Sequence, residues 1–459
     1  MLINPLSKFV NKDIMPPLGL AWLAVALEQN SISVEILDAL VERKDLETVS
    51  NDVKKTCPDI VGITCVTATR SDAFKMADKI RGTYSSTTIV MGGPHVTFTA
   101  EDTLQNIQSV DIIVRGEGEV TFVELVKALE SGKDLTQVKG ISFRSGENII
   151  HNPSRPFIED LDSLPFPARH LLPMEKYDFT IPFSNVKATN VMSGRGCPIG
   201  CIYCSTSAMW GKKIRVRSPS HVVDEIEQIV KEYGIKGIYF FDDTFTFHKR
   251  RTTEICDEII QRGLDLTWFC ESRVDDVDEE LLTKMKKAGC KIITFGIESG
   301  SQRVLDIIKK KTTIAQSINA INLCKKVGIK SKSFFIYGVP GELLQDMEAT
   351  IRLVYGLNSD VKIPGMCEIR PGTELEFTAK ELNIMPDGFS WAKEGDLVPK
   401  FGQQEPLDKQ RAMIQRKVWR EHLFNPTYVL KRLIELNIKI LPRLRQIVSA
   451  YISIITRRD

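Results

Sequence analysis

The sequence lacks the features that mark membrane-spanning, secreted and nucleic-acid-binding proteins. It contains no run of about 18 uncharged apolar residues, so it predicts no transmembrane helix. Its opening apolar residues meet Asn4-Pro5 at once, and we therefore expect no signal peptide. The formal net charge is only +2, and this balance gives no indication of a nucleic-acid partner.

Paired cysteines of the kind that staple secreted domains are also missing. Most of the 10 cysteines stand singly, which favours a reducing compartment and a cytoplasmic location. The chain has 459 residues, of which 42% are hydrophobic and 26% are charged. This profile is typical of a globular protein with more than one domain.

Residues 1–140 alternate short apolar runs with amphipathic helices. Runs such as Ile60-Val61-Gly62-Ile63 are continuously apolar, as in parallel strands that are buried on both faces. This rhythm predicts an α/β domain with a Rossmann-like, doubly wound sheet. Gly-x-Gly-x-x-Gly is absent from the first strand–helix turn, which argues against a dinucleotide ligand. The expected strands are 1–4, 34–38, 59–65, 88–92 and 111–115, and the expected helices include 18–29 and 71–81.

We assign residues 141–185 to an interdomain linker. It begins with a hairpin-like segment, expected at 141–144 and 148–151. Residues 152–182 then hold six prolines and show no periodicity, which is typical of a connecting segment.

Residues 186–375 return to alternating strands and helices. Ser218 and Pro219 are a helix start signal and Gly234 is the matching stop signal. The series predicts a partial (β/α)₆ barrel of the TIM type, in which chemistry takes place at the C-terminal ends of the strands. The expected strands lie near 189–193, 237–241, 266–270, 291–297, 332–338 and 361–369.

Residues 376–459 lose the strand rhythm and become helical and basic. An apolar stripe runs from Leu430 to Val448, with lysines and arginines beside it. We interpret it as a helix packed on the barrel; a substrate lid and a membrane-surface face are the alternatives.

Cys197, Cys201 and Cys204 form a CxxxCxxC motif, which is the strongest signal in the chain. Thiolates are the ligands that iron–sulfur clusters prefer, and Gly196 and Gly200 favour a loop around such a cluster. No fourth cysteine is close, so one iron would stay open for a ligand from outside the protein. Two alternatives are a set of buried structural cysteines and a zinc site, although no histidine follows at finger spacing.

The motif resembles the signature of the radical S-adenosylmethionine (SAM) superfamily. The resemblance implies a [4Fe–4S] cluster whose open iron binds SAM, and one-electron cleavage of SAM to a 5′-deoxyadenosyl radical. It also implies SAM contacts beside the cluster and at the ends of later strands, where carboxylates could accept hydrogen bonds from an ammonium group. The positions that match are Tyr203, Asp242, Asp243, Arg273, Glu298, Ser299 and Gly338.

The first half resembles the cobalamin-binding domain of one large radical SAM branch. The matching segments begin at Pro16, Gly62, Gly92 and Arg115, so the resemblance covers roughly residues 1–375. It implies cobalamin contacts at Leu18, Gly19, Thr64, Gly92, Gly93, His95, Glu117, Gly118 and Glu119. The alternative is a Rossmann-like module that has lost its cofactor.

The sequence contains no Asp-x-His-x-x-Gly, the motif that supplies the lower axial histidine in other B12 proteins. The cobalamin is therefore expected in a base-off form without that ligand. His95 is the histidine nearest the expected crevice, either as a cobalt ligand or as a residue that structures its loop or contacts the corrin.

The combined resemblance implies a B12-dependent radical SAM methyltransferase that methylates an unactivated carbon, with a protein or peptide side chain among the candidate substrates. Ring closure or C–C bond formation on a lipid or tetrapyrrole is the alternative enzymatic function. A cobalamin or redox sensor without catalysis is a third. The expected partner is a flavodoxin- or ferredoxin-type electron donor.

Overall fold

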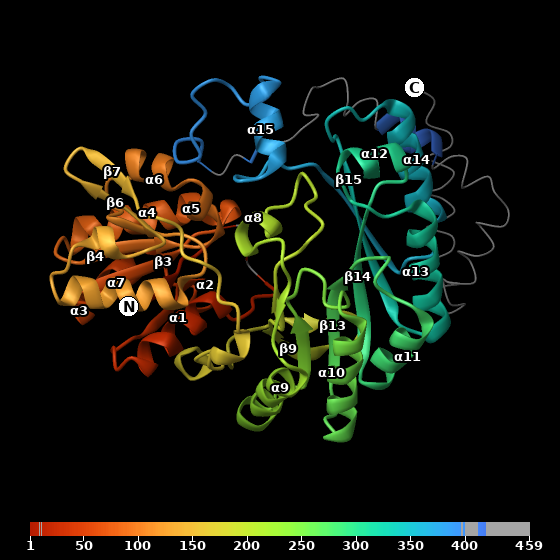
Figure 1. Cartoon of the computed structure of the whole chain (residues 1–459), viewed down its shortest axis with the longest axis horizontal. Helices are drawn as coiled ribbons and strands as arrows, with labels where there is room; N and C mark the ends of the chain where they lie inside the picture. Colours follow the sequence, from red (N-terminus) through yellow and green to blue (C-terminus); the bar gives the residue numbers. More distant parts are fainter. Residues whose placement is uncertain (9, 11, 396–397, 400–411, 419–459) are drawn as a thin grey trace, which may run out of the picture.

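The computed structural model describes residues 1–8, 10, 12–395, 398–399 and 412–418. Within this part of the chain, two α/β domains lie side by side, each built on a seven-stranded sheet (Figure 1). No helix in the described residues is both long and apolar enough to cross a membrane. The apolar stripe expected between Leu430 and Val448 lies outside the described residues.

The first sheet has the strand order β2-β1-β3-β4-β5-β6-β7. Strands β1 to β5 are parallel, which confirms the doubly wound architecture expected from the apolar runs. The strands are β1 (Leu2–Asn4), β2 (Ile36–Asp38), β3 (Ile60–Thr64), β4 (Thr88–Gly92), β5 (Ile112–Val114), β6 (Ile141–Ser145) and β7 (Asn148–His151). The helices are α1 (Leu18–Gln29), α2 (Ala39–Glu42), α3 (Leu46–Thr56), α4 (Arg70–Thr83), α5 (Pro94–Phe98), α6 (Ala100–Asn106) and α7 (Gly118–Glu130).

The hairpin β6–β7 belongs to this sheet and not to a linker. Strand β6 pairs antiparallel with β5, and β7 pairs with β6. Ile141 and Phe143 pack into the core beneath α1 and α7, and this burial holds the hairpin on the sheet edge. The sheet therefore extends to His151, past the boundary that we expected at residue 140.

Alternate residues of the parallel strands supply two separate cores, one on each face of the sheet. Leu2 packs with α1 and α7, whereas its neighbour Ile3 packs with α3 and α4. This division follows from the period of two in a strand. It leaves the carboxyl ends of the strands as the free edge, where a ligand binds in folds of this kind.

The second sheet has the order β16-β15-β14-β13-β12-β9-β8. Strands β9 and β12 to β16 are parallel, which confirms the partial barrel, and β8 pairs antiparallel with the edge of β9. The strands are β8 (Thr180–Ile181), β9 (Val186–Val191), β12 (Gly237–Phe240), β13 (Thr267–Ser272), β14 (Cys290–Glu298), β15 (Lys330–Tyr337) and β16 (Val361–Met366). A separate ladder pairs β10 (Gly194–Arg195) with β11 (Arg215–Val216).

Helices cover the outer face of this sheet (Figure 1). The caps read from the sequence are confirmed for α9, because the Ser218 hydroxyl accepts a hydrogen bond from the backbone of His221 and Gly234 is left-handed. The helices are α8 (Thr206–Trp210), α9 (Pro219–Tyr233), α10 (Lys249–Gln261), α11 (Glu279–Lys287), α12 (Gln302–Ile307), α13 (Ile314–Val327), α14 (Leu344–Gly356) and α15 (Glu374–Glu381).

After β16 the chain turns back toward the first domain. We call residues 367–395 the strap. Its helix α15 lies above the space between the two domains, and its last part contacts the first domain (Figure 1). Ser390 donates a hydrogen bond to Asp102 (2.6 Å), and the backbone N–H of Ala392 donates to the same carboxylate (3.0 Å).

Candidate active site at the domain junction

Cys197, Cys201 and Cys204 lie on the loop between β10 and α8. All three thiols are free and half-buried. Gly196 enters the loop with a φ of +104°, and a Cβ atom there would meet the carbonyl oxygen of Lys213 at 2.3 Å, so only glycine fits. The loop therefore presents three sulfur donors within one tight turn of chain.

The chemistry of this donor set fits an iron–sulfur cluster. Burial raises the pKa of the Cys201 thiol to about 11, and the neighbouring Cys204 and Cys197 also raise it, so the three sulfurs lie near one another. Metal binding would displace these protons, since the thiolate is the ligand. Of the other seven cysteines, six are buried and Cys57 is exposed in the first domain, so no fourth ligand joins the loop.

A single-ion site is not formed by these residues. In the described part of the chain, no three His, Cys, Asp or Glu side chains are grouped so that they could hold one metal ion. In a cubane cluster each thiolate binds a different iron, so its ligands do not converge on a point. The three half-buried thiols match that second arrangement.

Asp242 and Asp243 follow β12, but their side chains have different surroundings. Asp242 is buried and accepts hydrogen bonds from the backbone N–H groups of Ser193 (2.6 Å) and Gly194 (3.1 Å), and from the Ser193 hydroxyl. Asp243 is exposed and accepts one from the Thr206 hydroxyl (2.7 Å). Asp242, expected as a SAM contact, is thus committed to the start of the cysteine loop, and Asp243 is the carboxylate open to a ligand.

The environment of Asp243 also changes its acidity. Crowding by protein atoms, with the nearby charges of Asp242 and Glu271, raises the pKa of Asp243 to about 6, although its side chain still contacts water. Near neutral pH the group is ionised and able to accept a hydrogen bond from an ammonium group.

Glu298 ends β14 in a buried ion pair that the sequence did not predict. Its Oε1 lies 2.8 Å from Nζ of Lys310, and the two side chains are 7% and 10% exposed. Burial and the charge of Glu298 raise the pKa of Tyr203 well above its ordinary value, and the two side chains share a hydrogen bond. Nothing in the sequence indicated that Lys310 is buried, because it stands in a run of three lysines, and such a run normally indicates a solvated surface.

The other three residues that were expected to contact SAM form hydrogen bonds within the protein. Arg273 is buried and donates hydrogen bonds to the carbonyl of Lys310 (3.0 Å) and to Asp275 (2.7 Å). The Ser299 hydroxyl is fully buried against Thr350 on α14 (2.9 Å). Gly338 is left-handed, and its N–H donates to Glu342. These residues shape the loops around the site.

A group of side chains inside the barrel was not predicted from the sequence. Tyr239 stacks on Phe269 with 4.0 Å between ring centroids, and its hydroxyl donates to Glu271 (2.8 Å). The ammonium of Lys332 lies 4.9 Å from the ring of Phe334. Glu is depleted in strands, so Glu271 near the end of β13 was the available signal.

On the first domain, the expected cobalamin contacts fall into two groups. Thr64, Gly92 and Gly93 lie at the carboxyl ends of β3 and β4 and are partly exposed. Gly93 has a φ of +109°, and a Cβ atom there would lie 2.6 Å from the carbonyl oxygen of Cys65. Leu18 is buried in α1, whereas the neighbouring Gly19 is exposed with open space around it.

His95 is fully buried behind this edge. Its Nδ1 lies 3.2 Å from the Thr67 hydroxyl, and its ring packs edge-on against Trp391 of the strap, with 5.9 Å between centroids. Burial and the charge of Arg70 lower the pKa of His95 to about 3, so the imidazole is neutral. In this position it holds the loop after β3 against α5 and the strap.

Glu117 and Glu119 face the second domain. Glu117 accepts from Arg195 (2.8 Å) and Arg215 (2.7 Å), and Glu119 accepts from Arg195 (2.6 Å). Both were expected to contact cobalamin; instead their carboxylates are committed to the ladder β10–β11. Gly118 between them is partly exposed, and a Cβ atom there would lie 2.9 Å from Leu23.

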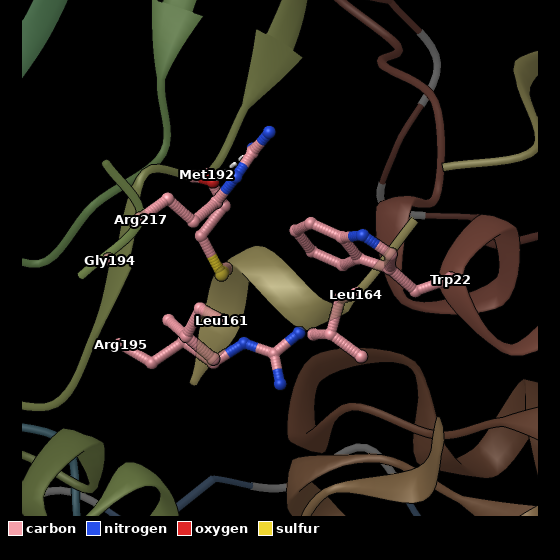
Figure 2. A pocket seen from close by; sticks show the side chains of 7 residues that line it. All are labelled: Trp22, Leu161, Leu164, Met192, Gly194, Arg195 and Arg217. Carbon is pink, nitrogen blue, oxygen red and sulfur yellow. Dashed lines mark hydrogen bonds between the residues drawn. The ribbon is translucent and has the colours of Figure 1, made fainter. Parts of the chain in front are cut away.

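A small hollow of about 10 Å³ lies at this junction. Figure 2 shows Trp22 entering it from α1, and Arg195 and Met192 entering it from the second domain. Seven residues line it: Trp22, Leu161, Leu164, Met192, Gly194, Arg195 and Arg217.

Comparison with known proteins agrees with this two-part organisation. Residues 10–126 match the B12 binding domain, and residues 191–354 match the radical SAM superfamily. An uncharacterized methyltransferase of Pyrococcus horikoshii is 37% identical over 440 residues, which cover 95% of this chain and 94% of the relative. An anaerobic magnesium-protoporphyrin IX monomethyl ester cyclase of Cereibacter sphaeroides is 32% identical, with 84% of this chain and 63% of the cyclase covered.

The fold has a solved counterpart. The cobalamin-dependent S-adenosylmethionine radical enzyme OxsB aligns with a TM-score of 0.76 at 20% sequence identity, over 98% of this chain and 70% of OxsB. The two family models confirm both halves expected from the sequence motifs, and with them the cluster, SAM and cobalamin that this family uses. The chain belongs to the B12-binding radical SAM family and is an enzyme of its methyltransferase branch.

Proposed function

We propose that this enzyme methylates an unactivated carbon atom of its substrate by radical chemistry. One observation supports this most: the carboxyl ends of the strands in the two sheets meet at the same junction. Arg195, just after β9, contacts Glu117, just after β5, and Asn190 of β9 donates to the carbonyl of Pro16 (3.0 Å). Ligands of both folds bind at those strand ends, so the two cofactors would face one substrate.

The side chains would hold and orient the cofactors, and the cofactors would supply the reactive groups. When bound, the reduced cluster with SAM supplies a radical that abstracts hydrogen, and the cobalamin supplies the methyl group. Cys197, Cys201 and Cys204 would hold the cluster. Hydrogen abstraction needs no side-chain base, and we assign none.

Individual side chains would orient SAM beside the cluster. Asp243 is exposed, is ionised near neutral pH and lies at the end of β12, so it would accept the SAM ammonium group. Glu298 would accept a ribose hydroxyl through the oxygen that does not bind Lys310, and Tyr203 would shield it from water. On the first domain, Thr64, Gly92 and Gly93 would contact the corrin through backbone groups and a small side chain.

Radical cyclisation without methyl transfer is the second candidate. The observation that favours it is the 32% identity to the cyclase of Cereibacter sphaeroides. In both cases a reduced flavodoxin- or ferredoxin-type protein would deliver the electron to the cluster.

The products of SAM distinguish the two candidates. The reconstituted enzyme, loaded with cobalamin, would be incubated without oxygen with methyl-deuterated SAM, dithionite and a cell extract that supplies substrate. Methylation predicts S-adenosylhomocysteine, 5′-deoxyadenosine and a deuterated product. 5′-Deoxyadenosine without S-adenosylhomocysteine would favour cyclisation, and formation of neither would refute both proposals.

A further inference from the structure

Arg195 stands two residues before Cys197 and is held almost entirely by the first domain. Its Nη1 donates to Glu117 (2.8 Å) and its Nη2 to Glu119 (2.6 Å). The arginine side chain is 3% exposed, and the two glutamates are 4% and 8% exposed. Paired hydrogen bonds from a planar guanidinium to carboxylates fix direction as well as distance.

Two indole rings complete the surroundings of this guanidinium. Its central carbon lies 4.9 Å from the ring centroid of Trp22 and 5.2 Å from that of Trp210. Trp22 belongs to α1 of the first domain, and Trp210 ends α8, which directly follows the third cysteine. Arg195 precedes the cysteine loop and Trp210 follows it. The contacts of the Arg195 side chain therefore connect both ends of the loop to the first domain.

The ladder that carries Arg195 depends on the same glutamate. Arg195 and Arg215 are directly opposite each other in β10–β11, where like charges repel. Glu117 forms ion pairs with both arginines and so offsets the repulsion between their charges. Its second oxygen accepts a hydrogen bond from the backbone N–H of Ile158 (2.7 Å). A carboxylate of the first domain thus stabilises the strand pairing beside the cluster loop in the second.

Stability alone does not require this arrangement. Buried ion pairs often gain little over apolar side chains of equal volume, whereas hydrogen bonds from a planar guanidinium to carboxylates add geometric specificity. Lysine could not replace the arginine, because its single ammonium cannot form the paired bonds and the planar stacking together.

We infer that Arg195 is a positioning residue that sets the distance and orientation of the cluster loop relative to the cobalamin domain. This inference rests on the proposed function, in which both cofactors act on one substrate. Misplacement by about 1 Å costs on the order of 10²-fold in rate when two groups must meet in a defined geometry. Arg195, Glu117, Glu119 and Trp22 together hold that geometry.

The distance between the two metal centres tests this directly. The reduced cluster and cob(II)alamin each carry an unpaired electron, so pulsed electron paramagnetic resonance measures their dipolar coupling in the fully loaded enzyme. We expect one narrow distance in the wild type, and a shifted and broadened distribution in Arg195→Lys and Glu119→Gln. Iron content and bound cobalamin are expected to stay at wild-type levels in both variants.

Arg144→Lys is the matched control. Arg144 donates hydrogen bonds to the carbonyls of Leu104, Ile107 and Val110 within the first domain, away from the junction. The same substitution there should leave the distance distribution unchanged. A variant at Arg195 with both cofactors bound and a wild-type distribution would overturn the inference.

Two further measurements keep the test decisive. If Arg195→Lys fails to keep its cluster, Trp22→Phe changes only the ring on the first-domain side, and a wild-type distribution there would overturn the inference. Cleavage of SAM to 5′-deoxyadenosine without substrate reports on the cluster site alone and is expected to persist in the variants. The distance needs no methyl transfer, so failure of the proposed function and failure of this inference give different results.

Discussion

Removal of the Asp242 carboxylate is expected to release the start of the cysteine loop. In Asp242→Ala the backbone N–H groups of Ser193 and Gly194 both lose their acceptor. Ser193 is fully buried, and an unsatisfied buried donor costs about 1–3 kcal/mol. The N–H of the half-buried Gly194 can turn to water at lower cost, so we expect a loss of about 3 kcal/mol in the free energy of unfolding.

Two substitutions that keep these N–H groups satisfied serve as comparisons. Asp242→Asn keeps an oxygen for both N–H groups, and the Ser193 hydroxyl can turn to accept from the new amide, so we expect a loss of about 1 kcal/mol. Asp243→Ala removes one hydrogen bond at an exposed position and is expected to cost less than about 1 kcal/mol.

Urea unfolding of the cofactor-free chain, followed by tryptophan fluorescence, measures these differences. Iron and sulfide per chain after anaerobic reconstitution provide the functional readout, which we expect to fall in Asp242→Ala and to stay normal in Asp242→Asn. Equal destabilisation by Asp242→Ala and Asp243→Ala would refute the assignment of Asp242 as the anchor of the loop.

Three further predictions follow from the same contacts. Alanine at Cys197, Cys201 or Cys204 is expected to abolish iron binding, whereas the buried Cys324→Ala keeps full iron; retention of iron by any of the first three contradicts the cluster assignment. Trp391→Ala is expected to lower the free energy of unfolding by about 3–4 kcal/mol, and an unchanged urea midpoint would contradict the packing of the strap. Burial raises the pKa of Glu342 to about 7, so this carboxyl stabilises the fold below its ordinary pKa and loses that contribution as pH rises through about 7. Glu342→Gln should therefore raise the thermal midpoint relative to the wild type at pH 8.5 and not at pH 5; the same shift at both values would contradict the raised pKa.

The sequence predicted the elements because their signals are local. Apolar runs located the parallel strands of both sheets within a few residues but missed the short edge strand β8, which lies in the expected linker. The Ser218-Pro219 start with the Gly234 stop placed α9 correctly. The cysteine motif, with three sulfurs in eight residues, is also local. Such signals do not depend on which distant segment packs against them.

The pairings that complete the site join residues far apart in the chain. Glu117 meets Arg195 across 78 positions, and Arg70 meets Trp391 across 321. A glutamate at a strand end indicates a ligand crevice, but the same edge of the first sheet also receives the second domain. Glu117 and Glu119 were therefore expected to contact the cofactor, although their position in the fold was correct.

The strap makes the two halves of this polypeptide mutually dependent. Trp391 covers His95 in the first domain, while Leu375 of the same segment donates its N–H to the carbonyl of Ile202 within the cysteine turn (2.9 Å). A fragment that ended with β7 would uncover an imidazole and the apolar residues beside it, and one that ended with β16 would leave the cysteine turn without its outer support. Recombination that exchanged either half alone would therefore have to bring a compatible strap with it.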